Sequence, residues 1–102
     1  MAKQTKITKM ARGQICKAQL PGVCDHNEAT AVFAHYRAPG LSGVGQKPSD
    51  MFGAFLCYSC HAEVDRRTRV LEGDFVKLEF LKAVIRTQND LRLAGLIKVD
   101  GE

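Results

Sequence analysis

The hydrophobic and polar positions first form a regular pattern at residues 31–36. Val32 and Ala34 fall on one face of an extended chain, and Phe33 and His35 fall on the other. An alternation with a period of two residues is typical of a β-strand. We therefore predict a short strand that ends near His35.

A second apolar run lies at residues 51–56 and leads directly into the sequence Cys57-Tyr-Ser-Cys60. Between the two runs, residues 38–50 are rich in glycine and proline, which end regular structure, so we expect a loop. Residues 62–69 contain good helix formers without a breaker. The simplest order is therefore strand, loop, strand, cysteine turn and helix.

The third pattern is a long amphipathic segment after Gly73. Asp74 can cap a helix that continues through about Leu93, and Gly95 is placed to end it. The apolar positions recur at helical spacing, so we expect the helix to pack over the core, with a partner-binding face as the alternative. These positions are Phe75, Leu78, Leu81, Val84, Ile85 and Leu91.

Length and composition indicate one domain. With 102 residues, 45% of them hydrophobic, the chain can bury one modest core, and a second independent domain is not expected. Residues 1–11 resemble a flexible basic arm, and residues 12–102 a single α+β domain. The chain has no Trp and only 7% aromatic residues, so its core is thin and gains from a metal or from disulfides.

The cysteines are the candidates for that reinforcement. Two disulfides would require an oxidising compartment and an export signal. The first residues of the chain alternate polar and basic positions and contain no apolar segment for a signal peptidase or a membrane. We therefore expect a cytoplasmic protein with reduced thiols and no membrane association.

Reduced cysteines at this spacing favour one structural zinc ion. Cys57 and Cys60 stand on a tight turn from which both sulfurs can reach one tetrahedral ion, and Cys16 and Cys24 can complete a four-sulfur site. The gap between Cys16 and Cys24 is longer than usual for a zinc knuckle, so His26 could replace a cysteine. Four unrelated buried thiols are the other interpretation. A site with four protein ligands is closed to water, so the zinc would stabilise the fold without performing chemistry.

Positive charge is concentrated near the N-terminus of a chain whose formal net charge is +4 and whose pI is about 9.0. Such an arm suits a nucleic-acid backbone, because neutralised phosphates release condensed counterions. The alternative is a solvated tail that only improves solubility. The cations that precede Asp25, the first acidic residue, are Lys3, Lys6, Lys9, Arg12 and Lys17.

Two histidines and an aspartate are the candidates for catalytic chemistry. His61 follows the second cysteine pair and is expected in the first turn of the helix, beside the zinc turn and not on it. His35 ends the first strand, and the loop after it can fold back to bring Asp50 near both histidines. A single histidine is more often a packed or hydrogen-bonded residue than a catalyst, so the assignment depends on the combination.

This combination resembles the zinc-containing HNH nucleases of the ββα-metal, or His-Me finger, superfamily. The elements of the resemblance are Ala34-His35, Asp50 and Leu56-Cys57-Tyr-Ser-Cys60-His61. Residues 12–69 as a whole are similar to small nucleases encoded by lambdoid phages and cryptic prophages. The resemblance implies a treble-clef-like zinc core of two strands, a loop and a helix, to which this chain adds a C-terminal helix.

The resemblance also implies a role for each candidate residue. His35 is the general base, Asp50 stands at the position of the middle asparagine and orients His35, and His61 binds a catalytic divalent metal, Mg²⁺ or another ion. A neutral imidazole can accept a proton from water near neutral pH, while the metal neutralises the scissile phosphate. This is the chemistry of phosphodiester hydrolysis.

One position departs from the family pattern. HNH nucleases commonly carry an acid or a second histidine directly before the base, as a metal ligand, where this chain has Ala34. Asp65, one helical turn after His61, could supply a carboxylate, or it could be a surface charge paired with Arg69. Alternatively, His35 binds the metal and another residue is the base.

A group of cations is placed to hold phosphates beside these residues, although an ordinary solvated surface is the alternative. The group comes from the loop and from the helix after His61. Its members are Arg37, Lys47, Arg66, Arg67 and Arg69.

The sequence thus predicts an α+β protein, built on a zinc-containing ββα finger, that acts as a metal-dependent endonuclease on double-stranded DNA in a phage context. The first alternative is a non-catalytic zinc finger that binds nucleic acid during phage recombination or expression. The second is a protein-interaction module that uses the C-terminal helix. A nuclease requires His35 and His61 in one open cleft, whereas a binding module needs only a basic surface.

Overall fold

The computed structural model describes residues 5–37, 40 and 48–102. The predicted order of two strands, a cysteine turn and two helices is present, and a short helix precedes it. The elements are α1 (Lys6–Lys9), the 3-10 helix η1 (Glu28–Thr30), β1 (Val32–His35), β2 (Gly53–Leu56), α2 (Tyr58–Val64) and α3 (Gly73–Leu93).

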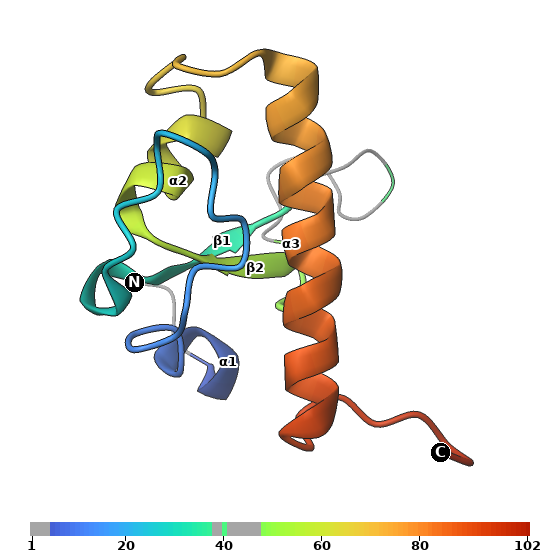
Figure 1. The fold of residues 1–102 in the computed structure, drawn as a ribbon. Helices are drawn as coiled ribbons and strands as arrows, with labels where there is room; N and C mark the ends of the chain where they lie inside the picture. The colour runs from blue at the N-terminus through green and yellow to red at the C-terminus, as the bar shows by residue number, and fades with distance from the viewer. Residues whose placement is uncertain (1–4, 38–39, 41–47) are drawn as a thin grey trace.

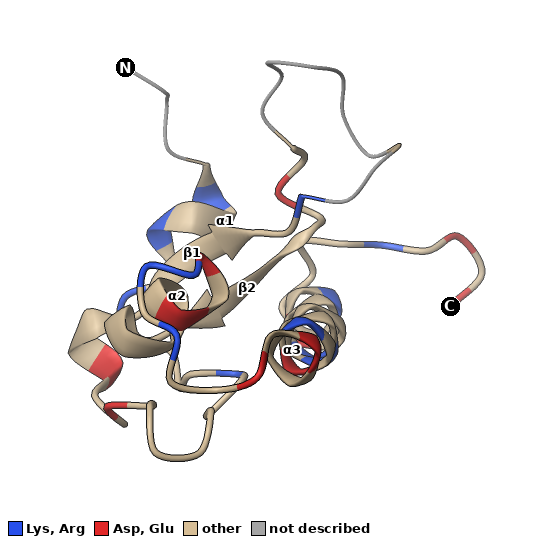
Figure 2. Ribbon diagram, turned by 90° about the horizontal axis from the view of Figure 1, so that it is seen from above, with Lys and Arg blue, Asp and Glu red and all other residues tan. Residues whose placement is uncertain are grey.

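The two strands form an antiparallel pair between α1 and α3 (Figures 1 and 2). Phe33 lies opposite Phe55, and His35 lies opposite Gly53. A side chain at Gly53 would place its Cβ 2.5 Å from the ring of Phe33, so glycine is required there. All four residues of β2 are buried, whereas only Ala34 is buried in β1. β2 is therefore the inner strand against α3, and β1 carries the more accessible positions.

Residues 5–11 differ from the predicted flexible arm. Ile7 and Met10 pack against a buried cluster that contains Ala11, Phe55 and Leu91. Lys6 and Lys9, which directly precede these two apolar residues, are solvent-exposed, as expected for an amphipathic turn. The sequence analysis considered only the basic residues of this segment. Its three apolar residues, Ile7, Met10 and Ala11, pack it against the hairpin.

The span predicted for α2, residues 62–69, is wrong at both ends. Cys57 caps the helix, and its Sγ accepts a hydrogen bond from the backbone N–H of Cys60 at 3.3 Å. The helix ends at Val64, and Arg66 adopts a left-handed conformation with φ of 60°. The arginines that follow therefore lie on a loop and not on the helix.

The predicted C-terminal helix is present as α3, but its N-cap is Glu72 and not Asp74. The Glu72 carboxylate accepts hydrogen bonds from the backbone N–H groups of Asp74 and Phe75, each at 3.0 Å. The helix therefore begins at Gly73, two residues earlier than an Asp74 cap would place its start. Gly95 ends the helix as predicted, with φ of 78°.

The buried face of α3 differs from the predicted face. Four of the apolar positions expected in the core are exposed, namely Phe75, Leu78, Leu81 and Ile85. The small residues Ala83 and Thr87 face the core instead, and Thr87 Oγ1 accepts a hydrogen bond at 3.3 Å from the backbone N–H of Phe55 in β2. Neither α3 nor any other helix in the described residues is long and apolar enough to cross a membrane.

Candidate metal centre and adjacent cleft

Four cysteine sulfurs meet where the N-terminal segment packs against the start of α2. The Sγ atoms of Cys16, Cys24, Cys57 and Cys60 all lie within 4.8 Å of one another, and those of Cys24 and Cys57 are 3.7 Å apart. In a tetrahedron with Zn–S bonds of about 2.3 Å, neighbouring sulfurs are separated by about 3.8 Å. All four cysteines are free thiols, so the cluster fits a zinc ion and the alternative of two disulfides is not realised.

The long gap between Cys16 and Cys24 is explained by two consecutive turns. Gln19 adopts φ of 45°, and its backbone N–H donates to Cys16 Sγ at 3.4 Å. The Leu20 N–H donates to Cys60 Sγ at 3.4 Å, and the Leu20 carbonyl accepts from the Cys24 N–H at 3.0 Å. Backbone donors directed at sulfur stabilise thiolates, so the segment both completes and supports a metal site.

The electrostatics of the cluster fit a divalent cation. The hydrogen bond between Cys16 and Cys60 lowers the pKa of Cys16 to about 4, whereas burial raises the pKa of Cys24 to about 12. The hydrogen bond with Cys16 and burial also raise the pKa of Cys60. The protein alone thus favours one thiolate, and a bound zinc ion would stabilise all four. His26, the alternative ligand, is exposed and is not a member of the cluster.

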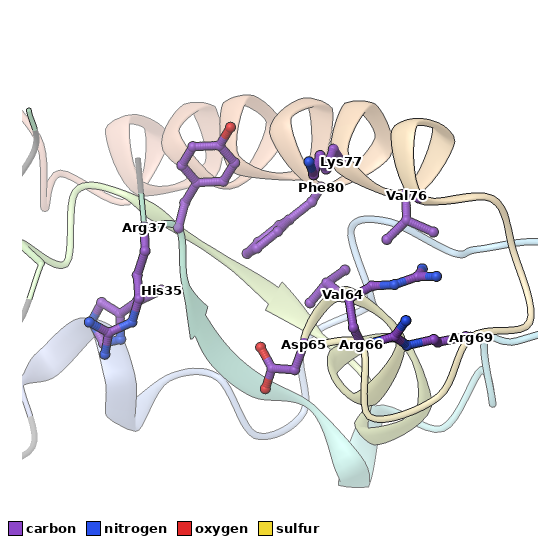
Figure 3. Close-up of a pocket in the computed structure, with 11 residues that line it drawn as sticks. His35, Arg37, Val64, Asp65, Arg66, Arg69, Val76, Lys77 and Phe80 are labelled. Atoms are coloured by element: carbon purple, nitrogen blue, oxygen red, sulfur yellow. The ribbon is translucent and has the colours of Figure 1, made fainter. Parts of the chain in front are cut away.

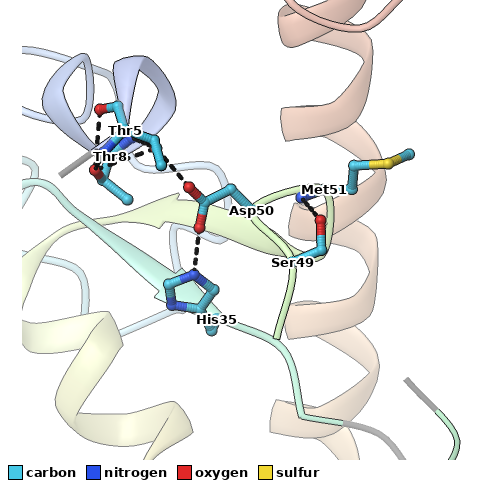
Figure 4. A network of polar contacts seen from close by, with 6 residues as sticks. All are labelled: Thr5, Thr8, His35, Ser49, Asp50 and Met51. Carbon is cyan, nitrogen blue, oxygen red and sulfur yellow. Dashed lines mark hydrogen bonds and ion pairs between the residues drawn. The ribbon is translucent and has the colours of Figure 1, made fainter. Parts of the chain in front are cut away.

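A separate polar group lies at the end of β1 (Figure 4). His35 Nε2 is 2.7 Å from Asp50 Oδ1, and the Thr5 hydroxyl donates a hydrogen bond to Asp50 Oδ2. The side chains of His35 and Asp50 are 17% and 12% exposed. Because a carboxylate only accepts hydrogen bonds, this pairing places the ring proton of His35 on Nε2 and leaves Nδ1 as an acceptor.

A turn at residues 49–52 positions Asp50. The backbone N–H of Tyr36 donates to the carbonyl of Phe52 at 2.8 Å, which extends the strand pairing beyond His35. Ser49 accepts two hydrogen bonds, at Oγ from the Met51 N–H at 3.1 Å and at its carbonyl oxygen from the Phe52 N–H at 3.0 Å. The turn places Asp50 beside His35. The loop argument expected Asp50 near both histidines, but the carboxylate that His61 faces is that of Asp65.

His61 and Asp65 form a second histidine–aspartate pair at the C-terminal end of α2. His61 Nε2 lies 3.2 Å from Asp65 Oδ2, and these side chains are 28% and 48% exposed. Asp65 also lies 3.6 Å from Arg67, so its ionic partners are His61 and Arg67 and not the predicted Arg69. Burial lowers the pKa of His61 against the opposing effect of Asp65, which favours the neutral ring that metal binding requires.

A cleft of about 510 Å³ joins the two pairs. It lies between β1, the end of α2 and the N-terminal half of α3, and both His35 and Asp65 line it (Figure 3). His61 is not a lining residue itself but contacts Asp65, which is. The rest of the lining consists mainly of cations and apolar or aromatic side chains, namely Arg37, Arg66, Arg69, Lys77, Tyr36, Val64, Gly73, Val76 and Phe80.

Three of the five cations predicted to bind phosphate line this cleft, namely Arg37, Arg66 and Arg69. Arg67 lies outside it, with its guanidinium 5.9 Å from the centre of the Tyr58 ring. Lys47 lies outside the described residues. Lys77 lines the cleft and was missed, because the sequence analysis assigned this helix to the core, or alternatively to a partner protein, and not to the phosphate-binding surface. Its position directly after the buried Val76 is informative only once the buried face of α3 is known.

Glu63 holds the basic loop after α2 in place, and it was also missed. Its fully buried carboxylate accepts hydrogen bonds from the Thr68 hydroxyl and from the backbone N–H groups of Val70 and Leu71, at 3.2 and 2.8 Å. Arg66 lies 3.6 Å away. The hydrogen bond from Thr68, together with those from the backbone, holds the pKa of Glu63 below its ordinary value. The signal in the sequence that could have indicated a buried carboxylate is the position of Glu63 between two apolar residues, Ala62 and Val64.

Fold and site together define a small α+β protein in which a four-cysteine cluster that fits a zinc ion lies next to a basic, histidine-containing cleft. The profile of the family described as "Putative nuclease YbcO" matches residues 5–96, and the chain belongs to this family. The resemblance to phage and prophage nucleases is thereby confirmed at the level of the family. The match extends beyond residues 12–69 and includes both α1 and α3.

Individual relatives agree with this assignment. The chain is 41% identical over 92 residues to "Putative nuclease YbcO" of Escherichia coli K12 and to "Putative nuclease ybcO" of Enterobacteria phage 82, covering 90% of this chain and 96% of each relative. The solved structure of a "putative bacteriophage protein" from E. coli K-12 MG1655 is 37% identical, with a TM-score of 0.76. That similarity covers 87% of this chain and 99% of the other.

Proposed function

We propose that this protein is a metal-dependent endonuclease of the HNH, or ββα-metal, type that hydrolyses double-stranded DNA. The observation that carries the proposal is one cleft lined both by His35, which Asp50 holds, and by Asp65, which pairs with His61. The family description supports nuclease activity. The order strand, strand, helix beside a four-cysteine cluster supports a treble-clef-like ββα finger.

His61 and Asp65 are the residues that would hold the catalytic metal. Their facing atoms are 3.2 Å apart, close to the separation of about 3.0 Å between adjacent ligands at about 2.1 Å from one Mg²⁺ ion. Asp65 then supplies the carboxylate that Ala34, buried within the hairpin, cannot supply. Two protein ligands suffice for Mg²⁺, which keeps several waters and binds substrate phosphates. When bound, the ion neutralises the scissile phosphate and stabilises the leaving oxygen.

His35 acts as the general base through Nδ1. Asp50 keeps the other ring proton on Nε2, so Nδ1 accepts a proton from water as the water oxygen attacks phosphorus and the bond to the leaving oxygen breaks. Asp50 then stabilises the imidazolium that forms, because its carboxylate faces the ring. The apolar side chains of the cleft, including Val76 and Phe80, limit the water around the reacting groups.

The cations of the cleft serve as the phosphate-binding surface. Arg37 and His35 come from one side, while Arg66, Arg69 and Lys77 come from the loop after α2 and from α3. Guanidinium groups bind phosphate oxygens in a bidentate manner, so this arrangement can hold the backbone on both sides of the scissile bond. We place this activity in the cytoplasm, where DNA is available and the cysteines remain reduced.

Plasmid nicking tests the proposal. The purified zinc-loaded protein is incubated with supercoiled DNA without added metal, with Mg²⁺ and with Mn²⁺, and zinc content is measured after each incubation. We expect strand scission that depends on the added ion while zinc content stays at one per chain. His35→Ala should abolish scission, whereas His26→Asn should not, since His26 is an exposed histidine outside the cleft.

A non-catalytic nucleic-acid-binding protein is the second candidate, and Ala34 is the observation that favours it. Without a ligand at that position, the metal site depends on Asp65 alone for a carboxylate. This candidate predicts salt-dependent DNA binding by the wild type and no scission with either metal. That result would replace the nuclease proposal.

A further inference from the structure

Leu78, Leu81 and Ile85 form an apolar stripe on α3 that faces away from the hairpin. Their exposed fractions are 52%, 42% and 60%, although they lie in the middle of a 21-residue helix. The face that packs on β2 is formed by other residues, including Ala83 and Thr87. The core therefore does not account for the stripe.

The stripe belongs to a longer repeat. Spacings of four and three residues alternate from Asp74 through the three apolar residues to Arg92, with Gln88 as the additional member. This is the heptad pattern by which two helices pack along a common seam. The seam has an acid at its N-terminal end and a base at its C-terminal end, and three of the four positions between them are apolar. The fourth, Gln88, donates a hydrogen bond from its side-chain amide to the Met51 carbonyl of its own chain at 2.7 Å.

We propose that this seam pairs with the same seam of a second copy of the chain. The two helices run antiparallel, and the two-fold axis passes between Leu81 and Ile85. In that arrangement Leu81 packs against the partner's Ile85, and Asp74 faces the partner's Arg92. In an antiparallel pair each a position of one helix faces a d position of the other. The third pair of facing positions here is Leu78 and the partner's Gln88. Because the contact is symmetric, it closes at two copies.

Charge selects this occupant and this orientation. A parallel pair would bring Asp74 against the partner's Asp74 and Arg92 against the partner's Arg92. The antiparallel pair brings opposite charges together at both ends. Lys82 lies close to the axis, but it is already paired with Glu79 of its own helix at 2.9 Å.

The pairing leaves the cleft accessible in both copies. The residues of α3 that line the cleft are Val76, Lys77 and Phe80. Val76 and Phe80 lie toward the core side of the helix, and Lys77, one turn before Leu81, borders the seam. These residues belong to the N-terminal half of the helix, so antiparallel pairing places the two clefts at opposite ends of the helix pair. The seam itself spans about 27 Å, at about 1.5 Å per residue.

Sedimentation of the full-length zinc-loaded protein over a concentration series tests the proposal. We expect the mass to rise from 11.2 kDa toward twice that value. Leu81→Glu should raise the dimer dissociation constant by about 30-fold or more, the effect of losing a central interface residue. Leu93→Glu is the matched control, since Leu93 is an exposed leucine of the same helix outside the seam. Zinc content and circular dichroism confirm that each variant folds.

A charge exchange distinguishes a second copy in this register from other contacts. Asp74→Arg alone and Arg92→Asp alone should each weaken the dimer, because each places like charges opposite one another. The double variant Asp74→Arg/Arg92→Asp should restore the wild-type dissociation constant. A wild type that remains monomeric at millimolar concentration, or a double variant as weak as the sum of its single changes, overturns the proposal.

Discussion

The cysteine cluster and the cleft share α2, yet they differ in nearly every property that governs metal binding. Cys60 is fully buried and faces three other sulfurs, whereas the next residue, His61, is partly exposed and faces one carboxylate. A closed set of four ligands binds an ion without any substrate. An open pair leaves coordination positions for water and phosphate. One short helix can therefore fix a structural ion on one side and present reactive groups on the other.

The largest expected effect is on the closed site. Cys60→Ser should unfold the protein, because metal binding that is coupled to folding supplies on the order of 10 kcal/mol. Zinc analysis and circular dichroism measure the result, and Ser59→Ala, a change in the same helix, is the control. A Cys60→Ser protein that is folded and zinc-free would show that the two sites are independent.

The open site should respond in a different way. His35→Ala should lower the rate of strand scission by about 10²- to 10⁴-fold, the usual contribution of a general base, without changing the Mg²⁺ concentration at half-maximal rate. His61→Ala and Asp65→Asn should instead raise that concentration. Nicking rates over a Mg²⁺ series separate the two behaviours. If His35→Ala shifts the metal requirement as His61→Ala does, His35 is a metal ligand and the base must be sought elsewhere.

Basic residues of the two regions should differ in their contribution to DNA binding. If Lys6, Lys9 and Arg12 of the N-terminal region all contact phosphate, changing them to glutamine should reduce the slope of log affinity against log salt by about 2.7. Changing Arg37 and Arg69 of the cleft should reduce the slope by about 1.8 and also slow scission. Titrations at several salt concentrations measure both. An unchanged slope for the first set would assign the N-terminal cations to solubility alone.

Features that depend on residues close together in the sequence could be predicted from it, whereas features that depend on distant contacts could not. The alternating strand, the Cys-x-x-Cys turn and the glycine that ends α3 depend on neighbouring residues. The buried face of α3 does not, because apolar residues occur on several sides of the helix and only the contact of Ala83 and Thr87 with β2 selects one.

The candidate site shows the same division. The resemblance supplied His35, Asp50 and His61, and the structure places Asp50 against His35. The resemblance did not predict where α2 ends. That end depends on the buried Glu63, whose carboxylate binds residues up to eight positions later in the chain. The resemblance also did not identify Lys77, which lines the cleft from a helix that the sequence analysis assigned to the core.

The Glu63 carboxylate offers a smaller test, through pH. Its pKa is held below the ordinary value of 4.5, so the stabilisation it provides is complete above that value and is lost as the pH falls through the lower folded-state pKa. Glu63→Gln should lower the thermal midpoint at pH 7 by several degrees and should remove this part of the acid sensitivity. Thermal melts between pH 3 and pH 7 measure it, with Glu28→Gln, at an exposed glutamate, as the control. Equal acid sensitivity in wild type and Glu63→Gln would assign it to other groups.

The smallest expected effect concerns Thr5, the N-cap of α1, which contacts the His35–Asp50 pair through its hydroxyl. Its hydroxyl donates to Asp50 Oδ2 while Asp50 Oδ1 faces His35, so Thr5 restrains the carboxylate that orients the proposed base. Loss of a hydrogen bond of this kind costs about 1 kcal/mol, and part of that loss should be expressed as a reduction in the scission rate of about two- to fivefold. Thr5→Val removes the hydroxyl at nearly constant volume, and Thr5→Ser retains it. Because Thr5 also caps α1, the two variants must be compared at equal folded fraction, measured by circular dichroism. A reduced rate in Thr5→Val that Thr5→Ser restores, with an unchanged Mg²⁺ requirement in both, would assign Thr5 to the base and not to the metal. Equal rates in all three proteins would show that the orientation of Asp50 does not depend on Thr5.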